Sequence, residues 1–304
     1  MKKKPPSIRL LTQQDFDIVR AYLNKDPLHN IYAIHALEIH GLESEYATFG
    51  GAFGGKGRLE GILFADNDWK PRLGCLVGDD PRVLARLGEF ALGVGVKSWI
   101  GKRAYIEPGM RKLNSRFRMN IKRFHFFEIH PGQFVRYDDY PVRAATEYDI
   151  PLLVELYRGY EFRNEFRTDK DIEHEIKRGM NGTGGYFLVE FEGRVVSAAR
   201  VAPETDLAGM IGAARTLPEY RGRGMYPSVR TACLEYLFKR GKIGLSYILD
   251  NDAAMGRVIE KFGFPPTDTW LAVDFRERPP LRQRILPVRI RRWGARVKQS
   301  ILRQ

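Results

Sequence analysis

The stretch from Ala213 to Tyr226, AARTLPEYRGRGMY, decides how the second half of this chain folds. Its residues up to Leu217 are typical of a strand, and the turn that follows contains two arginines and two glycines. From about Met225 to Arg240, apolar residues recur with the spacing of a helix. This order of elements suits a pyrophosphate, because glycines let the backbone approach and the free N–H groups at a helix start point at the anion. A plain tight turn is the alternative.

The same turn resembles the acetyl-CoA-binding motif of the GNAT N-acetyltransferase superfamily, Arg/Gln-x-x-Gly-x-Gly/Ala. Arg221 and Gly224 occupy the first two defined positions, and Tyr226 stands where the family has Gly or Ala. The resemblance implies that pantetheine lies in a split of the sheet, against backbone groups near the end of the strand. The CoA-binding residues that it implies in this stretch are Thr216, Leu217, Arg221, Gly222, Arg223, Gly224, Met225 and Tyr226.

A second motif supports the resemblance. The run from Asn251 to Phe264 resembles the family's Asn-initiated fourth helix and its closing Gly-Phe. Strict register places Asp252 where the family has Asn, with Asn251 one residue earlier, and we assign Asn251 to CoA binding. The resemblance covers about residues 142–275. It implies a mixed sheet that splays open at one strand, acetyl-CoA as co-substrate and no metal.

The chain contains an internal duplication. Residues 8–16, IRLLTQQDF, resemble residues 142–150, VRAATEYDI, and both predict a short strand that runs into a helix capped by Thr and Asp. Two unrelated capped helices are the alternative for this pair alone. Further matches follow in the same order: a hairpin turn at Gly57 and Gly193, and a helix that begins at Pro81 and Pro227. We therefore predict an α/β fold with tandem GNAT-like lobes, each a mixed, mostly antiparallel sheet flanked by helices.

The first lobe lacks the phosphate-binding chemistry. Opposite the arginine–glycine turn it has Cys75–Gly78, followed by Asp79 and Asp80, whose charge disfavours phosphate. We predict a degenerate GNAT-like lobe over residues 8–138, a GNAT acyltransferase domain over 142–275 and a single CoA site per chain.

Catalytic residues are harder to place. Transfer to an amine needs a base for the amine and an acid for the leaving thiolate, and the acid is often Tyr in this family. The strand from Leu207 to Leu217 has no carboxylate, and Ile259 occupies the helical position where many relatives have the acid. We name Glu161 as the candidate base and Tyr247 as the candidate acid. The alternatives are a solvated helix face for Glu161 and a core position for Tyr247.

Composition limits the remaining possibilities. The 304 residues are 43% hydrophobic, and no run of about 18 apolar residues predicts a membrane span. Two cysteines in apolar surroundings suggest no disulfide scaffold, and we expect a cytoplasmic protein. The net charge of +13 is concentrated in residues 278–304, which contain nine Lys or Arg and no Asp or Glu. We predict a basic amphipathic tail there, which binds an anionic surface, nucleic acid or an acidic carrier protein, or else packs on the body or on a second subunit.

The sequence thus predicts an acyl-CoA-dependent N-acyltransferase that moves acetyl to a primary amine on a small molecule or an amino-acid-like acceptor. Two alternatives remain. One is a non-catalytic acyl-CoA-binding regulator, and the other is an acyltransferase tethered to nucleic acid or membrane by its tail. A homodimer is a further candidate assembly.

Overall fold

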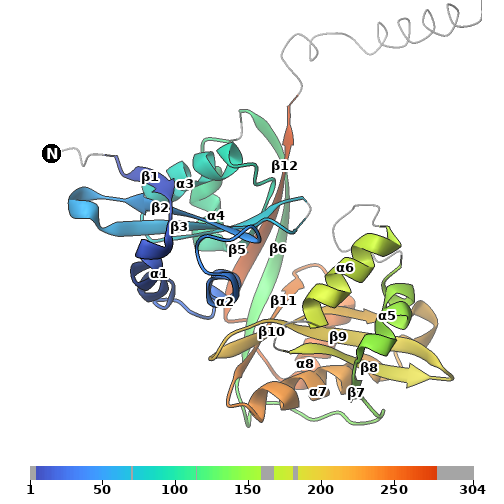
Figure 1. The fold of residues 1–304 in the computed structure, drawn as a ribbon. Helices are drawn as coiled ribbons and strands as arrows, with labels where there is room; N and C mark the ends of the chain where they lie inside the picture. Colours follow the sequence, from blue (N-terminus) through green and yellow to red (C-terminus); the bar gives the residue numbers. More distant parts are fainter. Residues whose placement is uncertain (1–4, 70, 114, 159–167, 181–183, 279–304) are drawn as a thin grey trace, which may run out of the picture.

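A computed structural model describes residues 5–69, 71–113, 115–158, 168–180 and 184–278. Their strands form one twelve-stranded sheet in the order β1-β2-β3-β4-β5-β12-β6-β11-β10-β9-β8-β7 (Figure 1). Neighbouring strands run parallel only at β4/β5 and β10/β11, and all other pairs are antiparallel. The strands are β1 (Ser7–Leu10), β2 (Ala47–Phe53), β3 (Leu59–Asp66), β4 (Leu73–Gly78), β5 (Ser98–Lys102), β6 (Phe117–Ile129), β7 (Arg143–Ala144), β8 (Gly185–Phe191), β9 (Arg194–Glu204), β10 (Ala208–Thr216), β11 (Ile243–Leu249) and β12 (Asp268–Glu277).

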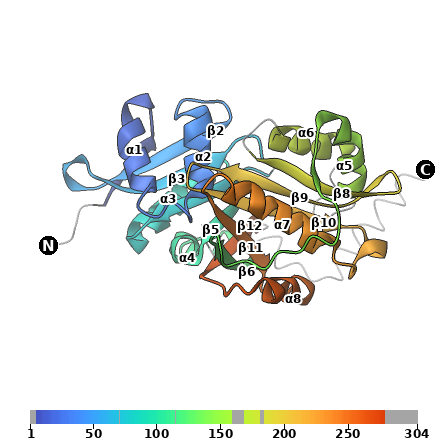
Figure 2. The same cartoon turned by 90° about the horizontal axis from the view of Figure 1, so that it is seen from below.

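Helices cover both faces of this sheet (Figure 2). One face carries α1, α2, α5 and α6 and is called the α2 face below; the other carries α3, α4, α7 and α8 and is called the α7 face. The mixed, mostly antiparallel sheet with flanking helices confirms the predicted fold class. The helices are α1 (Phe16–Leu23), α2 (Ile31–His40), α3 (Pro81–Gly93), α4 (Arg103–Met110), α5 (Ile150–Tyr157), α6 (Asp169–Met180), α7 (Met225–Phe238) and α8 (Ala253–Phe262).

The duplication is visible in matched local geometry. Thr12 and Asp15 form a capping box, in which the Thr12 backbone N–H donates to Asp15 Oδ2 over 3.0 Å, and Arg9 adds an ion pair of 2.7 Å to the same carboxylate. A second capping box and ion pair at the start of the second half repeat these contacts in Arg143, Thr146 and Asp149. The caps predicted from the sequence are therefore present in both copies.

The two halves exchange their last strands. β12, from the C-terminal half, lies between β5 and β6, and it pairs with β5 from Trp270↔Lys102 to Asp274↔Ser98. β6, from the N-terminal half, pairs with β11 from Gly244↔Ile129 onward. We therefore define the first lobe as β1–β5 with α1–α4 and β12, and the second lobe as β7–β11 with α5–α8 and β6. The predicted boundary near residue 140 falls in the connection between β6 and β7. Each lobe nevertheless contains one strand from the other side of this boundary.

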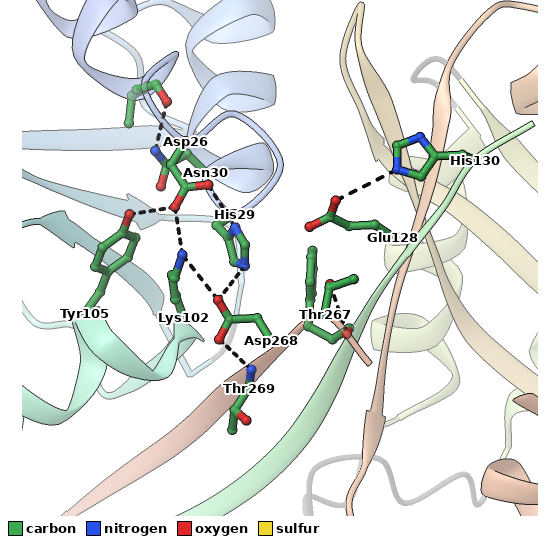
Figure 3. A network of polar contacts seen from close by, with 12 residues as sticks. Asp26, His29, Asn30, Lys102, Tyr105, Glu128, His130, Thr267, Asp268 and Thr269 are labelled. Atoms are coloured by element: carbon green, nitrogen blue, oxygen red, sulfur yellow. Dashed lines mark hydrogen bonds and ion pairs between the residues drawn. The ribbon is translucent and has the colours of Figure 1, made fainter. Parts of the chain in front are cut away.

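A polar network fastens β12 to the first lobe (Figure 3). Lys102 Nζ lies 3.2 Å from both Asp26 Oδ2 and Asp268 Oδ2, His29 Nδ1 lies 2.8 Å from Asp26 Oδ1, and Tyr105 donates to Asp26 over 2.8 Å. Burial works to raise the pKa of Asp26, but the hydrogen bonds of His29, Tyr105 and Lys102 outweigh it and hold that pKa well below its usual value. Asp26 is therefore the charged centre of the attachment.

No helix in the described part of the chain is long and apolar enough to cross a bilayer. The predicted basic tail lies outside the described residues, except for Arg278, whose Nε donates to the carbonyl of Phe117 over 3.0 Å.

Candidate functional site

The sheet splits open between β10 and β11. These strands pair only from Ala208–Met210 to Ile243–Leu245, and beyond that point β10 continues on β9 while β11 continues on β6. The hydroxyl of Ser246 donates to the carbonyl of Ile211 over 3.4 Å at the apex of the split. Backbone groups on the facing edges past this apex have no strand partner, so the split can accept an extended ligand as if it were a strand.

A β-bulge in β10 faces this split. The register against β9 shifts between Gly212 and Arg215, and Ala213 adopts a φ of 49°, in the left-handed region. The hydroxyl of Tyr157 donates a short hydrogen bond to the carbonyl of Ala213. Bulges re-aim backbone groups next to active sites, and this one is held in place by a side chain from α5.

The predicted phosphate turn has the backbone needed for close approach. Gly222 and Gly224 have φ of 76° and 87°, and Gly224 is the residue before α7, so the helix start is exposed to a ligand. The Arg221 Nε donates to the carbonyl of Thr216 over 3.2 Å, and the Arg223 guanidinium lies 5.4 Å from the ring centre of Tyr220. The turn therefore presents two cations and free helix N–H groups together.

An acidic residue lies over the turn. A Cβ added to Gly224 would stand 3.1 Å from Oδ2 of Asp139, which comes from the connection between β6 and β7. Asp139 is exposed, so its carboxylate is free to move, but it lies where phosphate oxygens would approach. Asp139 could not be assigned to this turn from the sequence, because it lies more than 80 residues away along the chain.

Tyr226 contacts an unusual arginine. Arg230, one turn further along α7, is fully buried, and its Nη1 lies 3.3 Å from Tyr226 Oη and 3.5 Å from Ser246 Oγ. Its Nε and Nη2 have no hydrogen-bond partner among the described residues. A buried cation with unmet donors is costly. Tyr226 and Arg230 thus bring polar hydrogen-bonding groups to the apex of the split on the α7 face.

The second motif lies on the other side of the split. Asp252 caps α8 and accepts from the N–H of Met255 over 3.0 Å, so Asp252 holds the capping position and Asn251 precedes it. Asn251 lines a cavity of about 390 Å³ between the lobes. The residues of this cavity come from both lobes: Glu107, Met110, Ile121, Lys122, Arg123, Leu249, Asp250, Asn251 and Leu271.

Tyr247 lies on the splayed part of β11, two residues past its last pairing with β10. It projects to the α2 face, where its ring stacks on Trp270 at 5.6 Å and its hydroxyl lies 3.2 Å from that of Tyr32 in α2. The first lobe thus contributes a residue beside the candidate acid. Glu161, the candidate base, lies outside the described residues.

The corresponding split of the first lobe is closed. β4 and β5 pair only at Leu73↔Ser98 and Gly74↔Trp99, so the strands diverge here as well. However, α3 and α4 are in direct contact: a Cβ on Gly88 would lie 2.4 Å from the carbonyl oxygen of Gly109 and 2.8 Å from Trp99. Helix contact and the Trp99 ring fill the groove at this point; that the first lobe has no CoA site stays a prediction.

The comparisons with known proteins point to one family. Residues 150–264 match the model of the acetyltransferase (GNAT) family. A search of curated proteins by sequence finds no match. Among solved structures, a GCN5-related N-acetyltransferase from Sphaerobacter thermophilus is similar, with a TM-score of 0.63 and 12% identity over 90% of this chain and 96% of that one.

Two further structures are similar over most of the chain. A tandem GNAT protein from the clavulanic acid biosynthesis pathway has a TM-score of 0.60 and 14% identity, and covers 90% of this chain and 99% of its own. A GNAT-family acetyltransferase from Colwellia psychrerythraea has a TM-score of 0.58 and 14% identity, with coverage of 89% and 100%. At sequence identities of 12% and 14%, similarity to these solved structures shows the fold alone. Residues 150–264 of the second lobe therefore match the acetyltransferase (GNAT) family, and the chain as a whole has the fold of a tandem GNAT protein.

Proposed function

We propose that the protein is an N-acetyltransferase that moves an acetyl group from acetyl-CoA to a primary amine. The observation that carries the proposal is the split between β10 and β11, which opens next to a glycine–arginine turn at the start of α7. In this arrangement the pyrophosphate binds at residues 221–226 and the pantetheine enters the split. The thioester then lies beside the bulge at Ala213.

We infer that the acetyl group is transferred directly from the thioester to the amine. The amine nitrogen attacks the thioester carbon, the C–N bond forms, and the C–S bond breaks as the thiolate leaves. The amine loses a proton to Glu161 or to water, and the thiolate receives a proton from Tyr247. The hydrogen bond between Tyr247 and Tyr32 holds the candidate acid in one orientation.

Thiol release from acetyl-CoA, measured across a panel of primary amines, tests this proposal. We expect amine-dependent release and a product heavier than the amine by one acetyl group. Tyr247→Phe removes the acid and should lower kcat at least tenfold, with little change in the KM for acetyl-CoA. Release that does not depend on any amine would contradict the proposal.

A non-catalytic acyl-CoA-binding protein is the second candidate. Two observations favour it: residues 208–216 contain no carboxylate, and Ile259 is buried where many relatives have an acidic Tyr. This candidate predicts CoA binding by calorimetry with no thiol release from any amine, so the same panel separates the two.

Association through residues 278–304 remains a separate proposal, motivated by their charge. Salt-dependent binding of the full chain to anionic vesicles or RNA, lost when the chain ends at Arg278, would support it. Sedimentation of the full chain would test the homodimer.

A further inference from the structure

Arg200 lies beside the bulge on the α2 face. It belongs to β9, and its register partners are Gly212 in β10 and Tyr186 in β8. Its neighbours Ala199 and Val201 are buried in the core on the α7 face, so the alternation of a strand directs Arg200 to the α2 face. Adjacent strands are roughly 4.8 Å apart, which places the arginine about one strand spacing from the backbone of Ala213.

The guanidinium of Arg200 makes no hydrogen bond in the described part of the chain. Among the described residues its Nε is buried without a partner, and its only ion pair there is a long one, 3.8 Å from Nη1 to Oε1 of Glu175. The side chain is 16% exposed. Arginine offers five donors, and a mostly buried arginine normally uses several of them. This arginine therefore has its charge partly balanced and its hydrogen-bonding positions open.

The residues packed around Arg200 leave room for its side chain on the α2 face. Helix α6 crosses over it at Gly179, where a Cβ would stand 2.7 Å from Arg200 Cδ and 2.9 Å from Nη1. The Tyr186 ring centre lies 5.8 Å from its guanidinium carbon. The candidate acid Tyr247 lies on the same α2 face, where its hydroxyl contacts that of Tyr32.

We propose that Arg200 binds a carboxylate of the acceptor, so that the acceptor is an amino acid or a similar amine that carries a carboxylate. This inference rests on the proposed N-acetyltransferase function and names its substrate class. A carboxylate fits the planar fork of a guanidinium and satisfies two of its N–H groups at once. With the carboxylate fixed there, the acceptor amine is held near the thioester at Ala213, on the same side of the sheet as Tyr247.

The test compares each amino acid with the amine formed by removing its carboxyl group. Suitable pairs are L-phenylalanine with phenethylamine, L-tryptophan with tryptamine, L-histidine with histamine and L-lysine with cadaverine. The wild-type protein should prefer the carboxylate-bearing member of its best pair at least tenfold in kcat/KM. Arg200→Gln should lower kcat/KM for that member by about 10- to 100-fold, mainly through KM, and leave the decarboxylated amine unchanged.

Three further variants separate binding from a structural role. Arg200→Lys keeps the charge but loses the fork, and should fall between wild type and Arg200→Gln. Glu175→Gln removes the competing carboxylate and should lower the KM of the carboxylate-bearing member, whereas a purely structural ion pair would make it behave like Arg200→Gln. Lys177→Gln, on the same helix but 55% exposed and paired with Glu173, is the matched control and should change neither constant.

Calorimetric titration of the same pairs into CoA-saturated protein gives a second readout that needs no turnover. Binding of the carboxylate-bearing members to wild type, and its loss in Arg200→Gln, supports the inference. Equal binding or turnover of both members of every pair, or a preference that survives Arg200→Gln, overturns it. Absence of thiol release from every pair would contradict the proposed function instead. The titration would then still test whether Arg200 binds a carboxylate.

Discussion

Gly224 combines a φ of 87° with a position at the start of α7, and both restrict what can replace it. A β-branched residue disfavours this conformation, and its side chain would enter the space that the phosphates need. We expect Gly224→Val to weaken CoA binding at least tenfold in a calorimetric titration. Gly224→Asn is the milder variant, because Asn tolerates the left-handed region. A folded Val variant with wild-type affinity would remove the turn from the binding site.

Replacing Asp139 should have the opposite effect on CoA binding at the same turn. Its carboxylate lies near Gly224, where it repels the pyrophosphate of CoA. Asp139→Asn should therefore lower the Kd for CoA several-fold at low salt, and the gain should shrink at about 1 M salt, where the Debye length is about 3 Å. Asp138→Asn, whose side chain is 70% exposed, is the control. Unchanged or weaker binding in Asp139→Asn would show that the carboxylate does not compete with phosphate.

At the residue scale, the sequence predicted what is local. Gly222, Gly224 and their arginines could be assigned because the strand, turn and helix that position them are contiguous. Asp139 and Tyr32 could not, because their neighbours at the site are far along the chain, and Arg200 could not, because its place depends on the register of two strands. In the sequence, Arg200 looks like an ordinary polar residue of a strand. Its position beside the bulge follows only from the pairing of Arg200 with Gly212.

At the scale of elements, the two capping boxes give a pH-dependent contribution. The ion pair and hydrogen bond from Arg9 lower the pKa of Asp15 to about 2, and Arg143 lowers that of Asp149 as well. Because the folded pKa lies below the unfolded value of about 3.9, this stabilisation is present above pH 4 and is lost as the pH falls toward 2. Asp15→Asn should lower the free energy of unfolding by about 1 kcal/mol at pH 7.

Urea denaturation at pH 7, 5, 4 and 3 checks this prediction. The difference between wild type and Asp15→Asn should be constant from pH 7 to 5 and should decrease below pH 4. Asp17→Asn, on the neighbouring turn, is the control. A difference that grows as the pH falls would mean that the carboxylate is not held in its charged form by the folded state.

The contact of α3 with α4 determines how many ligands a chain can hold. Since Gly88 and Gly109 close the groove of the first lobe, a calorimetric titration should give one CoA per chain. Gly88→Ala forces a Cβ against the Gly109 carbonyl, and should lower the melting temperature while leaving CoA affinity unchanged. Two equivalent sites per chain would show that the first groove opens.

At the scale of the whole molecule, the exchanged strands make each lobe depend on the other. Without β12, the first lobe loses Trp270, Leu271 and Val273 from its buried surface. Without β6, the second lobe leaves β11 with an open edge past the split. We expect fragments 1–138 and 139–304 to be insoluble or unfolded when produced separately, and to give a folded complex when produced together. A fragment that melts cooperatively by itself near the temperature of the full chain would contradict this.

The duplication allowed two lobes of similar plan to be predicted, but not the exchange between them. β6 and β12 have the composition of any half-buried strand, and a strand pattern does not specify which of two similar sheets it joins. The polar contacts of Lys102, Asp26 and Asp268 select one arrangement, and the contact between Lys102 and Asp268 joins residues more than 150 positions apart.

The place of β12 in the chain also sets the order of events during synthesis. A ribosome releases the N-terminal half first, and domains commonly fold as they emerge. Here the first lobe cannot complete its sheet until Glu277 has left the exit tunnel, because its sixth strand follows every other described strand in the sequence. The nascent N-terminal half must therefore wait with the edge of β5 uncovered, and its exposure to chaperones should last from the synthesis of β5 until that of β12.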